Sequence, residues 1–207
     1  MGKKIVLLVI IILQTLALGA QETANERQAR RIFNQAFGQV YGEQGAAFHY
    51  DVNIGSIYKT EGDIIVKGKK QKFVDERANV WSDGITTYMA YRKKKEVHIH
   101  AANSDKKDKY SGKFKFELDD FNYNIAEDGD KFLLTLTQKK KAKGTIKAVK
   151  AWVTKQGYEP VQLRLKVAFF WATIKLSHFK AGGISDDIFV FPRSQYKDWK
   201  FIDKRNE

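Results

Sequence analysis

Phe48-His49-Tyr50-Asp51-Val52-Asn53-Ile54 alternates apolar and polar side chains without a break. A period of two places Phe48, Tyr50, Val52 and Ile54 on one face of a β-strand. Similar stretches fill most of the chain after this point. The predicted further strands are 64–67, 72–76, 78–81, 85–92, 96–100, 121–125, 131–138, 144–155, 160–167, 170–179 and 187–191. This predicts a mainly β (α+β) fold built on a single antiparallel sheet of about ten strands, which is long enough to curl into a half-open barrel.

One helix is predicted before these strands. Thr23-Ala24-Asn25-Glu26 has the form of a capping box, with Thr23 as the N-cap. The apolar side chains that follow recur at steps of three and four residues: Ala29, Ile32, Phe33, Ala36, Phe37, Val40 and Tyr41. An amphipathic helix that ends near Gly42 therefore packs over the concave face of the strongly curved sheet. It is either an ordinary packing helix or a moving lid.

Some predicted strands are apolar on both faces. A strand with one solvent-exposed face alternates apolar and polar side chains. This alternation is absent from Val167-Ala168-Phe169-Phe170-Trp171-Ala172-Thr173-Ile174. The chain has no cysteine, so no disulfide framework supports it. An aromatic-rich sheet of this kind suggests a container for an apolar molecule.

The first 20 residues predict export. Met1-Gly2-Lys3-Lys4 is a short basic start, residues 5–13 are apolar, and Ala17-Leu18-Gly19-Ala20 is a small-residue exit. This is the order of a signal peptide, and the apolar core is shorter than the roughly 20 residues that span a bilayer. We therefore expect a signal peptide over 1–20 and one soluble, monomeric domain over 21–207, located in the periplasm.

The chain is strongly basic, because 37 Lys and Arg against 24 Asp and Glu give a net charge of +13. The positive residues gather in predicted turns, and those considered for membrane or partner contact are Arg92, Lys93, Lys94, Lys139, Lys140 and Lys141. Lysines at hairpin ends are typical of solvated turns that keep a protein soluble; the alternative is transient contact with a phospholipid surface. Nucleic-acid binders instead interleave basic and aromatic residues along one face, so no nucleic-acid partner is expected.

No pattern in the chain indicates catalysis. His98 and His100 share a strand face and with His49 or His178 make the nearest approach to a metal site, but His-x-His opposite Val97 and Ile99 is typical of polar alternation. Ser82 has no partnered base in the sequence. We therefore expect no catalytic residues, no metal and no cofactor.

Several motifs, in order along the chain, resemble the LolA-like outer-membrane lipoprotein carriers of Gram-negative bacteria. Gly62-Asp63-Ile64-Ile65-Val66-Lys67 is similar to the second strand of that family, and Ser82-Asp83-Gly84-Ile85-Thr86-Thr87-Tyr88 is similar to its "s-D-G-k-t-l-W" hairpin, with Tyr88 where Trp is usual. Ile188-Phe189-Val190-Phe191-Pro192 is similar to its terminal Phe-x-Phe. With the N-terminal helix, the resemblance covers essentially all of 21–207.

The resemblance implies a half-open barrel with an apolar cavity that receives the acyl chains of lipoproteins. It also implies two partners: an inner-membrane ABC release complex and an outer-membrane acceptor. The residues expected to line the cavity, from their alternation or helical stripe, are Phe33, Phe37, Phe48, Tyr50, Val52, Ile54, Leu163, Leu165 and Val167. One departure concerns closure, since Gly68 follows the second strand where the family commonly has a latching Arg. The alternative function is binding or sensing of another lipid or hydrophobic small molecule.

Overall fold

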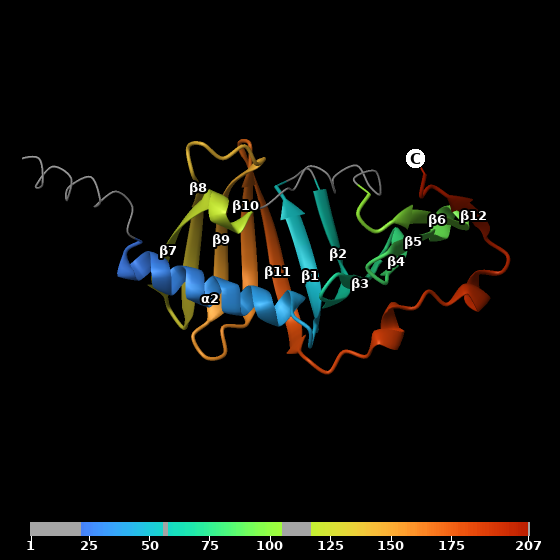
Figure 1. Cartoon of the computed structure of the whole chain (residues 1–207), viewed down its shortest axis with the longest axis horizontal. Coiled ribbons are helices and arrows are strands. Elements are labelled where there is room, and N and C mark those ends of the chain that lie inside the picture. The colour runs from blue at the N-terminus through green and yellow to red at the C-terminus, as the bar shows by residue number, and fades with distance from the viewer. Residues whose placement is uncertain (1–21, 56–57, 105–116, 207) are drawn as a thin grey trace, which may run out of the picture.

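The computed structural model describes residues 22–55, 58–104 and 117–206, which form one α-helix and twelve β-strands (Figure 1). The elements are α2 (Ala24–Tyr41), β1 (Ala46–Ile54), β2 (Tyr58–Lys67), β3 (Lys70–Asp75), β4 (Ala78–Ser82), β5 (Thr86–Tyr91), β6 (Glu96–Ala101), β7 (Phe121–Asp128), β8 (Lys131–Gln138), β9 (Ile146–Thr154), β10 (Pro160–Val167), β11 (Phe170–Ala181) and β12 (Lys200–Asp203). Short 3₁₀ helices are η1 (Arg92–Lys94), η3 (Leu118–Asp120), η4 (Asp186–Phe189) and η5 (Arg193–Tyr196). The predicted mainly β fold is confirmed. The predicted signal peptide lies outside the described residues.

All twelve strands belong to one sheet, in the order β12-β6-β5-β4-β3-β2-β1-β11-β10-β9-β8-β7. Neighbours are antiparallel except for β12, which runs parallel to β6. Two runs of consecutive strands, β1 to β6 and β7 to β11, meet at the centre of the sheet. There β1 pairs with β11 from Ala46 opposite Ala181 to Asn53 opposite Thr173. β12 and β7 are the two edges, so the sheet stays open.

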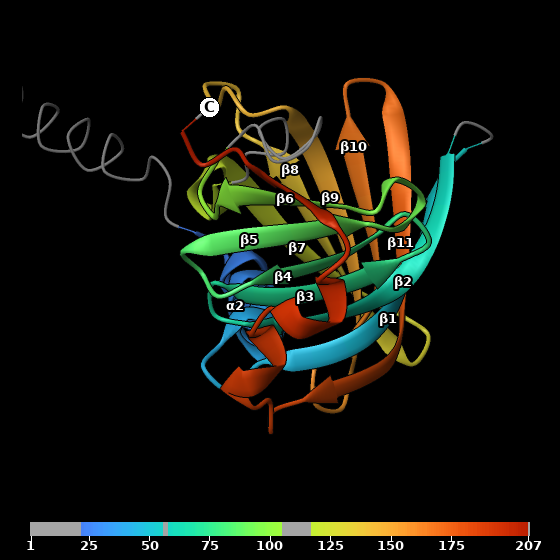
Figure 2. The same cartoon turned by 90° about the vertical axis from the view of Figure 1, so that its right-hand side faces the viewer.

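The sheet is strongly curved, as predicted. In Figure 2, β3 to β6 run across the direction of β8 to β11, because the direction of the strands turns steadily through β2 and β1. Right-handed twist accumulates from strand to strand, and a long sheet curls as a result. The concave face is the one that carries α2 (Figure 1).

The helix begins at the predicted capping box. The Thr23 hydroxyl accepts a hydrogen bond from the Glu26 amide (3.1 Å), and the Glu26 carboxylate accepts one from the Thr23 amide (2.7 Å). These two bonds satisfy backbone donors that the first turn leaves unpaired. The predicted apolar stripe faces the sheet, with Ala29, Ile32, Phe33, Ala36 and Val40 buried.

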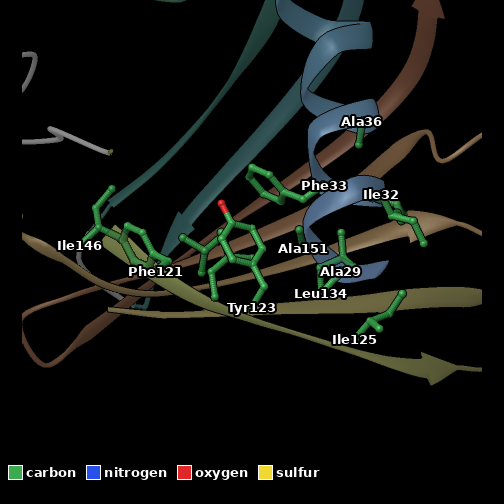
Figure 3. Close-up of a cluster of buried hydrophobic side chains, with 13 residues drawn as sticks. Ala29, Ile32, Phe33, Ala36, Phe121, Tyr123, Ile125, Leu134, Ile146 and Ala151 are labelled. Atoms are coloured by element: carbon green, nitrogen blue, oxygen red, sulfur yellow. The ribbon is translucent and has the colours of Figure 1, made fainter. Parts of the chain in front are cut away.

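The N-terminal half of the helix packs into the main core (Figure 3). Ala29, Ile32 and Phe33 lie over side chains from β7, β8 and β9, among them Tyr123, Leu134 and Ala151 (Figure 3). Burial of about 1.5–3 kcal/mol per large apolar side chain makes this the main contribution to holding α2 on the sheet.

The C-terminal segment forms a second, smaller core with the other half of the sheet. Trp81, Ala90, Val97 and Tyr196 are buried together, and Phe191, Trp199 and Phe201 pack against them. The strand predicted over 187–191 is wrong, because this stretch contains the 3₁₀ helix η4. Phe189 of η4 is buried, and Asp186 pairs with Lys67 and Lys70 of the β2–β3 hairpin at 2.9 and 2.8 Å. Tertiary contacts thus override the extended pattern, and the last strand is β12 instead.

Candidate ligand cavity

An apolar cavity of about 310 Å³ lies between the C-terminal half of α2 and the concave face of the sheet. Its wall combines α2 with six strands, because β1, β11, β10 and β9 are neighbours in the sheet while β2 and β3 complete one side. The lining residues are Phe33, Ala36, Phe37, Val40, Tyr41, Phe48, Tyr50, Val52, Ile64, Phe73, Ala151, Val153, Pro160, Leu163, Ile174 and Leu176. No charged side chain is among these lining residues.

The structure brings six of the nine predicted lining residues together: Phe33, Phe37, Phe48, Tyr50, Val52 and Leu163 line this cavity. The other three, Ile54, Leu165 and Val167, are not among its lining residues. Leu165 and Val167 are partly buried and pack against the main core. The period of two places all three on the same concave face, farther along β1 and β10. Occupancy by a ligand remains a prediction for all nine.

Sequence reasoning missed ten lining residues. Ile174 and Leu176 lie directly opposite Val52 and Tyr50 in the β1–β11 pairing, and Ile64 lies opposite Phe48 in the β1–β2 pairing. Their alternation is visible in the sequence, but the pairing of β1 with β11 is not. Ala36, Val40 and Tyr41 belong to the predicted helical stripe, which carries no signal of where the sheet leaves space.

The mouth of the cavity is aromatic. Phe37 and Tyr41 lie one helical turn apart with ring centroids at 4.6 Å, and they stay 40% and 48% exposed although they line the cavity. Large apolar side chains at this exposure line the entrance that a ligand would cross.

Tyr50 is the most deeply buried polar feature of the cavity wall. Its side chain is 7% exposed, its ring stacks on Phe73 at 5.5 Å, and its buried hydroxyl has no hydrogen-bond partner among the described residues. Burial raises the pKa of this hydroxyl well above its ordinary value, and the charge of Asp75 raises it further. The group is therefore a neutral donor across the physiological range, and an unpaired buried donor costs stability.

Gly62 creates the space for this side chain. It lies directly opposite Tyr50 on β2, and a Cβ there would approach the Tyr50 hydroxyl to 2.6 Å and the Val74 carbonyl oxygen to 2.3 Å. Only glycine lets the ring lie across β2 toward Phe73.

Four contacts hold the helix over the cavity. The Asn25 side chain donates to the Ile125 carbonyl (2.8 Å) and accepts from the Ile125 amide (3.0 Å), so it pairs with edge strand β7 as a backbone would. Arg30 forms an ion pair with Asp119 at 3.0 Å, and the Gln39 amide donates to the Gly157 carbonyl at 2.6 Å.

Gly68 takes part in the fourth contact. Its amide donates to the carbonyl of Gly42 at the helix C-terminus, at 3.2 Å. Gly68 lies in the β2–β3 turn with φ of +56°. A backbone hydrogen bond therefore ties the helix end to the position where the resemblance implied a latching Arg.

The predicted contact lysines lie on two separate turns. Arg92, Lys93 and Lys94 form η1 between β5 and β6, and Lys139, Lys140 and Lys141 are exposed between β8 and β9. The role of both turns in membrane or partner contact remains a prediction.

The described residues hold no group of three or more His, Cys, Asp or Glu that could bind a metal ion. His98 pairs with Glu96 at 3.0 Å, and His49 pairs with Asp63 at 2.9 Å. Among the described helices, none is long and apolar enough to cross a membrane.

No protein-family profile matches the chain, and no curated protein matches it. Solved structures do. An uncharacterized conserved protein from Thermus thermophilus matches 86% of this chain and 99% of its own, with a TM-score of 0.55 and 8% identity. A LolA superfamily protein from Nitrosomonas europaea matches 80% of this chain and 98% of its own, with a TM-score of 0.41 and 10% identity. LprF from Mycobacterium bovis matches 79% and 97%, with a TM-score of 0.45 and 9% identity.

At these identities the likeness is one of fold alone. The architecture that the resemblance implied, a curved open sheet with a helix over its concave face, is present in the structure (Figure 1). The cargo of such a fold is a separate question, because one fold serves many functions.

Proposed function

We propose that the protein is a carrier that binds an acyl chain in the cavity between α2 and the sheet. The observation that supports this is a wall of lining residues without a charge, entered past the exposed rings of Phe37 and Tyr41. Each methylene that moves from water into such a wall contributes about 0.8 kcal/mol. A cavity that buries part of one chain binds reversibly, as a carrier must.

We propose further that the cargo is an acylated lipoprotein, moved from the inner to the outer membrane through the periplasm. This rests on the LolA-like order of motifs, and it includes the two partners that the resemblance implies: an inner-membrane ABC release complex and an outer-membrane acceptor. Export through the predicted signal peptide over 1–20 belongs to the same proposal.

The cavity volume favours a second candidate, a binder or sensor of a single-chain lipid or another hydrophobic small molecule. At about 310 Å³ the cavity is at the low end of ligand sites, which run from about 300 to 1,000 Å³. A triacylated lipoprotein presents three chains, so its chains would need more room than this conformation offers.

Blocking the cavity tests the acyl-chain proposal. Ala36 is buried on the helix and lines the cavity, so Ala36→Phe fills part of the space. We expect it to lower the affinity for a fluorescent long-chain fatty acid about tenfold, since the loss of two buried methylenes has that size. Gln35→Phe, on the exposed side of the same helix, is the matched control and should bind as the unchanged protein does.

Release assays separate the two candidates. The purified protein is added to spheroplasts, and the soluble fraction is examined for triacylated lipoprotein. Release that Ala36→Phe abolishes supports the lipoprotein carrier. Fatty-acid binding without any lipoprotein release supports the single-lipid binder, and absence of both contradicts the proposed function.

A further inference from the structure

The hairpin between β10 and β11 ends in exposed aromatic side chains. Val167 pairs with Phe170, and Ala168 and Phe169 form the turn between them. Phe169 is 78% exposed, Phe170 is 46% exposed, and their ring centroids lie 4.2 Å apart. Ala168 has φ of +52°, which hairpin turns usually assign to Gly, Asn or Asp. The β10–β11 turn therefore carries apolar side chains where polar ones are usual, and it projects from the sheet (Figure 2).

An apolar strip connects this tip to the cavity. Leu163 lines the cavity, and Leu165 and Val167 follow it on the same concave face of β10. On β11 the lining residue Ile174 is followed toward the tip by Ala172 and Phe170, which lie opposite Leu165 and Val167. The strip therefore runs from the cavity wall to the exposed rings without a polar side chain on these two strands.

The opposite, convex face carries cations just behind the tip. In the first cross-strand row Lys166 lies opposite Trp171. In the second row Lys150 of β9 lies opposite Arg164 of β10. The same row continues through Thr173 and Asn53 to Lys59 of β2. Neither row contains an acidic residue on β9, β10, β11, β1 or β2. In the part of the chain that the structure describes, none of these four cations forms an ion pair.

Arg164 is stacked on an aromatic ring and lines an open groove. Its guanidinium lies over the Trp171 ring at 5.0 Å, and its buried Nε has no hydrogen-bond partner among the described residues. It lines an open groove of about 410 Å³ with Lys59, Lys175 and Asn53, whose Oδ1 is likewise unpartnered within 22–55, 58–104 and 117–206. Asp51, one row farther from the tip, is the first carboxylate in the groove. A phosphate oxygen is the acceptor that a stacked Arg and flanking Lys bind best.

The lysine-rich turn between β8 and β9 lies at the same end of the sheet. Ile146, the first residue of β9, pairs with Val167 at the base of the aromatic tip. Exposed Lys139, Lys140, Lys141 and Lys143 precede it. Aromatic rings at a projecting tip with lysines on both sides match the two layers of a membrane interface, an apolar boundary and anionic head groups.

We propose that the β10–β11 end of the sheet docks on an anionic phospholipid surface. Phe169 and Phe170 enter the interface, and Lys59, Lys150, Arg164 and Lys166 contact head-group phosphates. In this orientation the apolar strip extends from the membrane to the cavity. Docking is a property of the protein without ligand, so it stands or falls apart from the cavity proposal.

Flotation with vesicles tests this proposal directly. The protein should float with phosphatidylcholine vesicles that contain phosphatidylglycerol and not with phosphatidylcholine alone, and salt should weaken the binding. Phe169→Ser should lower the apparent affinity about tenfold, whereas Ile85→Ser should not. Ile85 is the matched control, because it is 81% exposed on the β4–β5 turn, away from this hairpin.

A second pair of variants removes positive charge from two different basic regions. Arg164→Gln with Lys166→Gln should lower the affinity about tenfold or more, since each cation near the surface contributes about a factor of five. Lys93→Gln with Lys94→Gln removes the same charge from the β5–β6 turn and should leave most of the binding intact. Unchanged melting temperatures show that each variant is folded.

A dye supplies the second readout. The chain has no cysteine, so Phe169→Cys and Ile85→Cys each accept a single environment-sensitive fluorophore. The dye at 169 should shift to the blue on anionic vesicles, and the dye at 85 should not. Four results overturn the proposal: no binding to anionic vesicles, equal loss in both charge variants, no shift at 169, or binding of free inorganic phosphate at the Arg164 groove without vesicle binding.

Discussion

Replacement of Tyr50 by Phe tests two effects of the unpaired hydroxyl: its effect on the stability of the fold and its effect on ligand affinity. The ring stays stacked on Phe73, and only the oxygen that lies buried without a partner among the described residues is removed. An unsatisfied buried polar group costs about 1–3 kcal/mol. We therefore expect Tyr50→Phe to increase the free energy of unfolding by that amount and to raise Tm by about 2–4 °C per kcal/mol in a chain of this size.

The same change should weaken one class of ligand. If the hydroxyl donates to the carbonyl of a bound ester, its loss leaves that carbonyl unpaired in an apolar wall. A loss of about 1–3 kcal/mol corresponds to a five- to hundredfold weaker affinity. An alkane of the same length has no acceptor, so its affinity should be unchanged.

The assay combines thermal unfolding with titration of a fatty acid methyl ester and the matching alkane. Tyr41→Phe is the control, because Tyr41 lines the same cavity but is half exposed, and its change should stay within about 0.5 kcal/mol. A Tyr50→Phe protein that is less stable than the unchanged protein would show that the hydroxyl has a partner in solution. Equal loss of affinity for ester and alkane would show that only the shape of the wall matters.

Two further predictions concern the scaffold. Gly62→Ala should lower the free energy of unfolding by about 1–3 kcal/mol and reduce fatty-acid binding, because the added Cβ meets the Val74 carbonyl and the Tyr50 hydroxyl. Gly38→Ala is the control: it lies in the helix with open space around it, so it should raise the free energy of unfolding by about 0.5–1 kcal/mol in urea titrations. Similar effects of the two substitutions would contradict the packing at Gly62. Hydrogen bonds from Lys70 and Lys67 lower the pKa of Asp186 from 3.8 to about 2. Because the folded pKa is the lower one, the ion pairs stabilise above about pH 4 and lose this effect as the pH falls toward 2. The stability difference between the unchanged protein and Asp186→Asn should therefore be constant above about pH 4 and vanish near pH 2, and a difference that persists below pH 2 would exclude these ion pairs as its cause.

Local patterns predicted the helix and most strands. The capping box at Thr23 and the stripe through Ala29 and Val40 are set by contacts within a few residues, so they can be read directly. The alternation from Phe48 to Ile54 likewise showed which side chains share a face. The same logic failed at 187–191, where an apolar run reads as a strand but Phe189 is buried by the distant β-sheet.

The sequence by itself determined the elements, their faces and the excess of positive charge. Only the tertiary structure decided which strands are neighbours, and that choice created the cavity. The pairing of β1 with β11 joins residues more than 100 positions apart and brings Val52 beside Ile174. It also aligns Lys150, Arg164 and Lys59 in one row behind the aromatic tip. The periods of two and 3.6 are properties of each segment, whereas register and strand order depend on long-range packing, which leaves no periodic trace in the chain.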